Sequence, residues 1–173
     1  MSSRIIEVVD YRDSWNDEFR QEKIRLQSAL NEDNVVAIHH IGSTSVKGLC
    51  AKPIIDILIE VKSLEKLDSE SYLMASFGYE VKGEFGIVGR RYFQKGGIQR
   101  SHQVYAFLVG SPEAKRHIAF RDYLITFPDI ALEYGALKRE AASICDNNID
   151  VYCNHKNSFI KEHEMKALRW KFS

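Results

Sequence analysis

Cysteine, proline, long apolar runs and an excess of charge of one sign are all scarce or missing in this sequence. The 24 Lys and Arg residues balance the 24 Asp and Glu residues, so no net charge favours extended nucleic acid or an acidic membrane surface. The three cysteines form no CxxC motif, which argues against a disulfide framework and a zinc ribbon. No apolar run approaches membrane-spanning length, and the first residues lack a signal-peptide pattern. We therefore expect a cytoplasmic protein with reduced thiols.

What the sequence does contain is typical of a soluble globular protein. Hydrophobic residues make up 45% of the chain and charged residues 28%. A chain of 173 residues is long enough to bury a substantial core. Because no internal repeat, low-complexity tract or linker interrupts it, residues 1–173 are predicted to form one domain.

The most informative stretch is residues 41–60, which read IGSTSVKGLCAKPIIDILIE. A turn of small residues joins an apolar strand over 35–41 to a second strand over 53–61 that is apolar on both faces and therefore central in its sheet. The second strand carries one carboxylate, Asp56. Burying an unpaired charge there costs several kcal/mol, so Asp56 needs partners. The donor-rich turn just upstream, formed by Gly42, Ser43, Thr44 and Ser45, is the place to look for them.

Apolar periodicity and turn residues predict the other elements. We expect a short strand over residues 5–9, a helix over 14–30, and a weak helix over 63–77. Two further strands are predicted over 90–94 and 102–108. The remaining elements are three helices, over 111–127, over 130–144 and from about residue 150. This order predicts an α/β fold with a helical C-terminal cover.

Three segments carry a family resemblance: residues 41–57 and 111–142, and to a lesser degree 152–160. They resemble the GrpB-like proteins, small bacterial proteins that are grouped by fold with the nucleotidyltransferase superfamily, whose best-known member is polymerase β. The resemblance covers residues 8–160 and implies a small mixed sheet of the nucleotidyltransferase type, with helices on one side and a helical C-terminal cover.

The resemblance also implies a site. In the superfamily a Gly-Ser turn holds the triphosphate of a nucleotide, and two acids in the pattern acid–apolar–acid, about 7 Å apart along one strand, hold magnesium ions. Gly42 and Ser43 match the turn, and Asp56 matches the first acid. Leu58 stands where the second acid belongs. Glu60 lies on the same face about 13 Å from Asp56, so it is interpreted as a strand-end residue, and the missing acid argues against ordinary nucleotidyl transfer.

Each candidate residue also has a structural interpretation. Asp56 is a ligand to a divalent ion (Mg or Mn) and the catalytic carboxylate, or else it caps the turn or pairs with Lys52. Thr44 and Ser45 either donate to phosphate or belong to an ordinary tight turn. His40 is a candidate metal ligand beside Asp56 or a donor to phosphate, or else a satisfied core histidine. His102 is a candidate metal ligand, or else forms a hydrogen bond within the sheet.

Basic residues form the last group of candidates. Arg121, Lys138 and Lys156 are predicted to form a positive rim over phosphates, or else intramolecular ion pairs on helix faces, as Arg121 would with Asp122. Lys52, just before the strand that carries Asp56, is either a donor to the ligand or a salt-bridge partner. The expected cleft lies between the turn, the strand that carries Asp56 and the helix that carries Arg121.

Three functions stay open. The first is a metal-dependent nucleotidyl or phosphoryl transferase acting on a small molecule, with Glu84 or the substrate supplying a second anionic ligand. The second is a catalytically inactive module that binds a nucleotide or a phosphorylated metabolite. The third is an interaction protein in which the small-residue string is only a turn.

Overall fold

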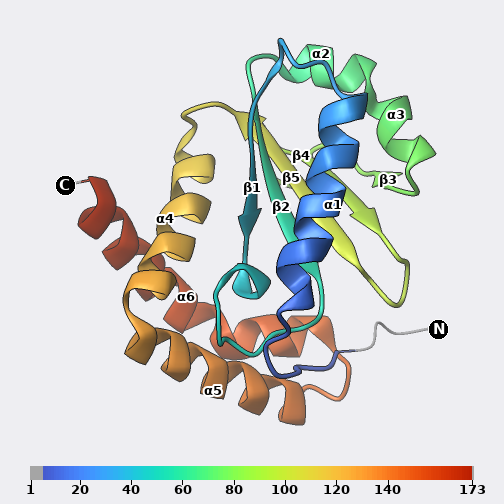
Figure 1. Cartoon of the computed structure of the whole chain (residues 1–173). Coiled ribbons are helices and arrows are strands. Elements are labelled where there is room, and N and C mark those ends of the chain that lie inside the picture. Colours follow the sequence, from blue (N-terminus) through green and yellow to red (C-terminus); the bar gives the residue numbers. More distant parts are fainter. Residues whose placement is uncertain (1–5, 173) are drawn as a thin grey trace.

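A five-stranded mixed sheet forms the centre of the computed structural model, which describes residues 6–172 (Figure 1). The strands follow the order β1 (Val35–Ile41), β2 (Ile55–Val61), β5 (His102–Leu108), β4 (Arg91–Lys95) and β3 (Glu80–Val81). β2 and β5 pair in parallel, whereas the other neighbours are antiparallel. The predicted α/β class with a mixed sheet is confirmed.

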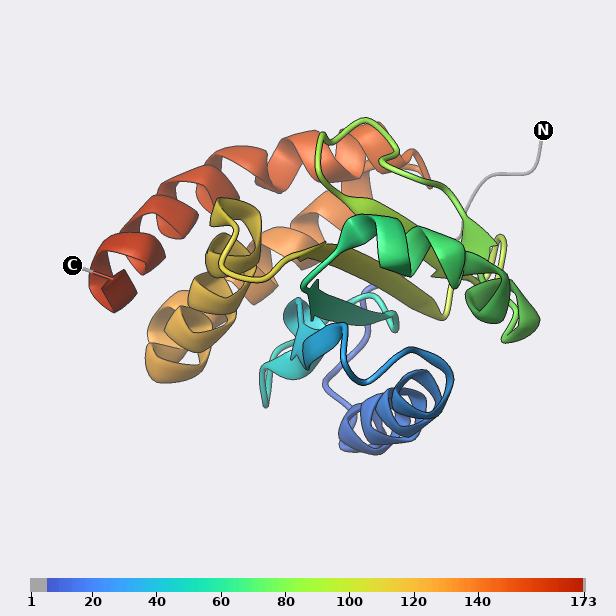
Figure 2. The ribbon, with the colours of Figure 1, turned by 90° about the horizontal axis from the view of Figure 1, so that it is seen from above.

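Helices cover both faces of the sheet. On one face lie α1 (Ser14–Ala29), α2 (Leu64–Ser69) and α3 (Ser71–Ser76), whose apolar side chains share one core cluster with β2. Figure 2 shows α4 (Pro112–Thr126), α5 (Pro128–Ile144) and α6 (Ile149–Phe172) across the sheet from α1. The short 3₁₀ helix η1 (Ser43–Ser45) lies at the end of the sheet nearest α5 (Figure 1). Within residues 6–172, no helix has both the length and the apolar character needed to cross a membrane.

The central strand β2 is buried on both faces, as its sequence predicts. Ile57 and Ile59 point into the core beneath α1, whereas Leu58 packs with α4 on the opposite face. Because side chains alternate along a strand, Asp56 points to the α4 face together with Leu58. Gln103 of β5 stands beside Asp56 in the parallel register and shares that face.

Two predicted elements differ from the structure. The helix expected over residues 63–77 is two short helices, α2 and α3, that meet at Glu70. The carboxylate of Glu70 accepts a hydrogen bond of 2.8 Å from the backbone N–H of Asn31, which ties the break to the end of α1. Of the strand expected over 5–9, Val9 forms only an isolated bridge with Ala51, and residue 5 lies outside the described residues.

A buried ionic cluster lies between α1 and the sheet. Glu22 of α1 is only 2% exposed and accepts hydrogen bonds from Lys95 Nζ at 2.9 Å and from Tyr79 Oη at 3.0 Å. His102 Nε2 lies 3.7 Å and Arg25 Nη1 3.5 Å from the same carboxylate. Burial opposes the charge of Glu22, but these partners, Lys95 first, outweigh it and hold the pKa of Glu22 below its ordinary value. Glu22 is therefore a buried charge with several partners, on the same face of α1 as the buried Trp15 and Leu26.

Candidate functional site

Asp56 lies directly against the turn. Gly42 has φ 71° and ψ −174°, a backbone conformation that is essentially restricted to glycine. A Cβ atom at Gly42 would lie 2.5 Å from Asp56 Oδ2, so only glycine lets the turn approach this carboxylate so closely. Asp56 is half-buried and pairs in register with Ile41, the last residue of β1.

The three hydroxyls of the turn have different roles. Thr44 is 1% exposed, donates from Oγ1 to the carbonyl of Ile54 at 3.1 Å and contacts His40 Nε2 at 2.9 Å. Ser45 donates from Oγ to the carbonyl of Gly42 and closes the turn. The Thr44 and Ser45 hydroxyls therefore hold the turn together. Ser43 lines the cavities beside Asp56.

Three lysines from distant segments line one cavity of about 300 Å³ beside Asp56, which we call the lysine cavity. Lys52 precedes β2, Lys138 lies on α5 and Lys156 lies on α6. The wall includes Gly42, Ser43, Lys52, Asp56, Gln103, Tyr105, Tyr134, Lys138, Tyr152 and Lys156. The structure thus brings the predicted Lys52, Lys138 and Lys156 together with Asp56 and the Gly-Ser turn.

Tyrosine rings support all three amines. Lys138 Nζ lies 4.7 Å from the centre of the Tyr134 ring, which is one turn earlier on α5. Lys156 Nζ lies 5.2 Å and Lys52 Nζ 4.7 Å from the centre of the Tyr152 ring, one turn before Lys156 on α6. These ring contacts hold the three lysine side chains in place, and each favours the charged form of its amine. The Tyr-x-x-x-Lys spacing, present in both helices, is the sequence signal that could have identified the two tyrosines.

Lys138 is the most buried of the three lysines. It is 2% exposed and donates from Nζ to the carbonyl of Cys50. Burial lowers the pKa of Lys138 to about 7; the charges of Lys156 and Lys52 act in the same direction, whereas Cys50 and Asp56 oppose the shift. Charged and neutral forms of the Lys138 amine are therefore both well populated at physiological pH.

This pKa makes the stability of the fold depend on pH. The pKa of Lys138 is lower in the folded chain (about 7) than its ordinary value of 10.5, so between these values the unfolded chain binds more protons. Stability due to this group is therefore lowest below pH 7 and rises toward pH 10.5, with a slope of at most about 1.4 kcal/mol per pH unit. We expect the difference in unfolding free energy between wild type and Lys138→Met to show this slope in urea titrations. A difference independent of pH would contradict it.

Gln103 connects Asp56 to the neighbouring strand. With its amide oriented to satisfy all of its neighbours, the Gln103 nitrogen donates to Asp56 Oδ1 and to Tyr105 Oη, both at 2.9 Å, and its oxygen accepts from Arg100 Nη1 at 3.2 Å. The carboxylate therefore lies among donors and cations. Sequence reasoning missed Gln103, because only the parallel register of β2 and β5 places it beside Asp56.

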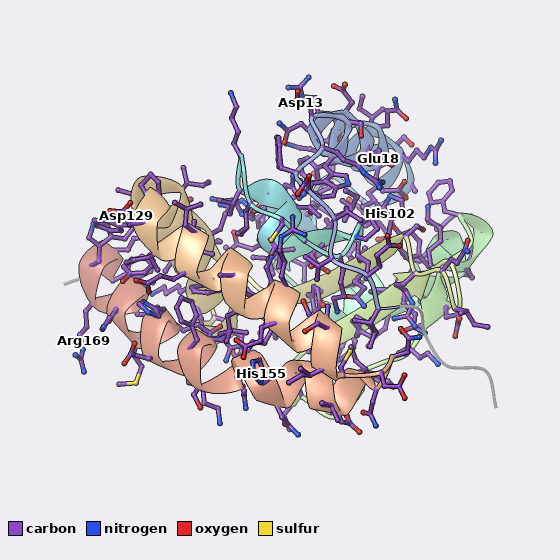
Figure 3. All side chains as sticks on the ribbon, turned by 90° about the horizontal axis from the view of Figure 1, so that it is seen from below. Asp13, Glu18, His102, Asp129, His155 and Arg169 are labelled. Carbon is purple, nitrogen blue, oxygen red and sulfur yellow. The ribbon has the colours of Figure 1, made fainter. Side chains whose placement is uncertain are left out.

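The predicted histidine ligands do not join Asp56. His40 stacks on Phe19 of α1 with ring centres 4.7 Å apart, and burial, then the charge of Arg121, lowers its pKa to about 4. His102 faces Glu22 and lies on the α1 side (Figure 3). Each occupies a strand position of opposite parity to Asp56, so the sheet separates them from it. Within residues 6–172, no three or more His, Cys, Asp or Glu side chains are placed to hold a metal ion.

Glu84, proposed as a second anionic ligand, and Glu60, interpreted as a strand-end residue, both have partners away from Asp56. Glu60 contacts His39 Nε2 at 2.8 Å and accepts from the backbone of Gly110 at 3.3 Å. Glu84 accepts from the backbone N–H of Gly89 at 2.8 Å in the loop between β3 and β4. Neither lines the cavities beside Asp56.

Arg121 borders Asp56 from the other side. It lines a smaller space of about 110 Å³ that also touches Gly42, Ser43 and Asp56. Its guanidinium donates to Asp122 Oδ1 at 2.9 Å and to the carbonyl of His40 at 3.2 Å. The intramolecular pair with Asp122 is therefore present, and Arg121 is not part of the lysine cavity.

Comparison with known proteins identifies the family of this chain. A family model described as GrpB protein matches residues 5–166. The chain belongs to the GrpB family. It is 46% identical to the UPF0157 protein YqkA of Bacillus subtilis over 97% of this chain and 49% of that protein. It is 34% identical to the glutamate-rich protein GrpB of Alkalihalophilus pseudofirmus over 90% of this chain and 91% of that protein.

A solved GrpB structure shows the same fold. The crystal structure of the conserved protein GrpB from Enterococcus faecalis superposes with a TM-score of 0.92 at 42% identity, covering 96% of this chain and 100% of that one. The predicted GrpB resemblance is confirmed. The chain spans about half of the length of the Bacillus relative.

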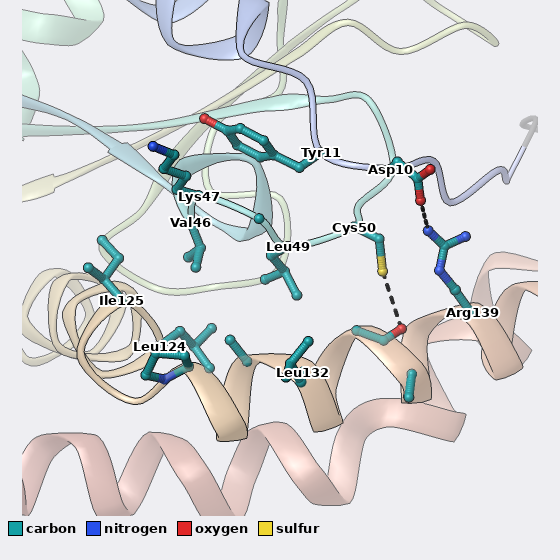
Figure 4. Close-up of a pocket in the computed structure, with 15 residues that line it drawn as sticks. Asp10, Tyr11, Val46, Lys47, Leu49, Cys50, Leu124, Ile125, Leu132 and Arg139 are labelled. Carbon is teal, nitrogen blue, oxygen red and sulfur yellow. Dashed lines mark hydrogen bonds and ion pairs between the residues drawn. The ribbon is translucent and has the colours of Figure 1, made fainter.

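A larger, mainly apolar cavity of about 780 Å³ lies apart from the lysine cavity (Figure 4). It lies on the other side of α5 and of the segment before β2, where Cys50 Sγ donates to the carbonyl of Gly135 at 3.3 Å. An ion pair between Asp10 and Arg139 lies at one end. None of the predicted site residues lines it, so size alone does not identify the site.

Proposed function

We propose that the lysine cavity binds the phosphate of a small phosphorylated molecule, a nucleotide or a phosphorylated metabolite. The observation that carries this proposal is the convergence of three lysines on one cavity beside a single carboxylate, Asp56. Lysine ammonium groups bind phosphate as point charges. The hydroxyl of Ser43 and the tyrosine hydroxyls of the wall are further donors for phosphate oxygens.

The size of the cavity limits the ligand. A volume of about 300 Å³ lies at the lower end of the range for small-molecule sites. The rings of Tyr134 and Tyr152 offer apolar surface to the rest of the ligand. This volume suits one phosphorylated small molecule rather than an extended nucleic acid.

The residues around Asp56 do not fit a divalent cation by themselves. One carboxylate facing three lysines and a glutamine amide lacks the set of oxygen ligands that magnesium or manganese requires. Metal-dependent nucleotidyl or phosphoryl transfer is therefore the second candidate. It is favoured by the close approach of Asp56 to Gly42, and it requires the ligand's own phosphate oxygens to complete the coordination.

Thermal shift with ATP and with inorganic phosphate tests the proposed function. We expect either ligand to raise the melting temperature without added metal. Lys156→Met removes one charged donor, which corresponds to about a 10- to 100-fold loss of affinity. Lys161→Met is the matched control, because Lys161 is an exposed lysine of the same helix outside the cavity. If neither ligand shifts the melting curve of the wild type, the protein is better interpreted as an interaction protein.

Asp56→Asn separates the two candidates. If the cavity is a binding module, Asp56→Asn leaves the metal-free rise in melting temperature unchanged or increases it. The reason is that the negative charge of Asp56, which repels the phosphate, has been removed. If Asp56 holds a metal for transfer chemistry, the variant loses a shift that depends on magnesium or manganese. Melting curves with and without each metal distinguish these outcomes, and we expect the first.

A further inference from the structure

Lys138 is far more buried than the other two lysines of the cavity, and phosphate binding does not require this burial. Lys52 and Lys156 are half-buried, whereas Lys138 is 2% exposed and is held by the carbonyl of Cys50 and the ring of Tyr134. A buried lysine beside other cations is the setting in which an amine becomes a nucleophile. Fully hydrated lysines bind phosphate equally well, so this burial points to a second task.

We propose that Lys138 forms an imine with the carbonyl carbon of a phosphorylated aldehyde or ketone, whose phosphate is held by Lys52 and Lys156. This inference rests on the proposed function and names the class of its ligand. In this proposal the most buried amine, Lys138, reacts with the carbonyl group, whereas the half-buried Lys52 and Lys156 bind the phosphate.

Formation of the imine requires only the Lys138 amine, the carbonyl group of the ligand and water. The lone pair of the neutral Lys138 amine adds to the carbonyl carbon, a C–N bond forms, and the C=O π electrons move to the oxygen. One proton of the amine passes to this oxygen through water and gives a neutral carbinolamine. A further proton from water converts the hydroxyl group into a leaving water molecule, the C–O bond breaks, and the nitrogen lone pair completes a protonated imine. No electrons are gained or lost overall. The protonated imine keeps one N–H group, which can still donate to the carbonyl of Cys50.

The electrostatics of the cavity favour the reactive form of this amine. Burial, together with the charges of Lys156 and Lys52, holds the pKa of Lys138 at about 7, against the opposing effects of Cys50 and Asp56. A large part of Lys138 is therefore neutral at physiological pH. For an ordinary exposed lysine only about one amine in a few thousand is neutral at that pH.

The test uses pyridoxal 5′-phosphate, which carries both an aldehyde and a phosphate, followed by borohydride reduction and peptide mapping of the full chain by mass spectrometry. We expect Lys138 to be the main reduced adduct, labelled about tenfold or more over the exposed Lys161, since the phosphate contacts raise the local concentration of the aldehyde. Pyridoxal, which lacks the phosphate, is expected to lose this preference. Half-maximal labelling of Lys138 is expected near its pKa of about 7.

Two further experiments distinguish failure of the imine proposal from failure of the proposed phosphate binding. Pyridoxine 5′-phosphate carries the phosphate but no aldehyde, and it should raise the melting temperature as inorganic phosphate does. If it does so while Lys138 remains unlabelled, or if label spreads evenly over Lys52, Lys156 and Lys161, the imine is wrong and the proposed function stands. If no phosphate compound binds, both fail. Lys138→Arg should remove the main adduct, and the wild-type peptide map decides the question even if this variant does not fold.

Discussion

Replacing Glu22 by alanine is expected to lower the free energy of unfolding by about 3–5 kcal/mol. The substitution leaves Lys95 Nζ and Tyr79 Oη, which lie 2.9 Å and 3.0 Å from the carboxylate, without their acceptor in a buried place. His102, 3.7 Å away, loses the same partner. Removing one member of a buried charge cluster is among the most destabilising single changes, because the remaining charges lose their compensation.

Chemical unfolding in urea measures the effect, and the corresponding fall in melting temperature is about 6–20 °C for a chain of this size. Glu18→Ala is the matched control, since Glu18 is an exposed glutamate of the same helix, and it should change the unfolding free energy by less than about 0.5 kcal/mol. A loss of similar size in both variants would show that the Glu22 cluster adds nothing specific to the fold.

The elements that surround the site could be predicted because each depends on local sequence. The run over residues 53–61 is apolar at successive positions, which a strand accommodates only when both faces are covered, and β2 is such a strand. The start of α4 follows from its cap: Ser111 Oγ accepts from the N–H of Ala114 at 3.2 Å, and Pro112 takes the first helical position.

What the sequence could not reveal is which side chains share a face. His102 and Gln103 are neighbours in sequence, yet the register with β2 places Gln103 beside Asp56 and His102 beneath α1. A shift of one residue would exchange them. Glu22 was similarly ambiguous, because a charge within an apolar stripe indicates exposure unless its partners on β4 and β5 are known.

The lysine cavity itself was foreseen only in part. Lys138 and Lys156 were candidates for a positive rim, and Lys52 for a separate donor to the ligand. More than eighty residues of sequence lie between Lys52 and Lys138. Their convergence depends on how α5 and α6 pack against the end of the sheet. Packing of helices on a sheet is set by many apolar contacts at once, which no short motif encodes.

Gly42→Ala is expected to abolish ligand binding and to lower the free energy of unfolding by about 2–5 kcal/mol. Two effects add. Alanine is strained at φ 71° and ψ −174°, and its Cβ would lie 2.5 Å from Asp56 Oδ2, so the turn or the carboxylate must move. Movement of the turn displaces Ser43, and movement of the carboxylate displaces Asp56, from the wall of the lysine cavity. Thermal shift with phosphate and urea unfolding measure the two consequences.

Gly48→Ala separates strain from collision. Gly48 also has a positive φ, 84°, but a Cβ there meets nothing within 4 Å, so this variant reports backbone strain alone and should still bind phosphate. Introducing Gly42→Ala into an Asp56→Ala background removes the colliding oxygen, and part of the lost stability should return if the contact with Asp56 is the cause. If Gly42→Ala and Gly48→Ala change the free energy of unfolding and phosphate binding equally in both backgrounds, the prediction is wrong. The turn would then have only a structural role, and the close approach of Gly42 to Asp56 would not matter for binding.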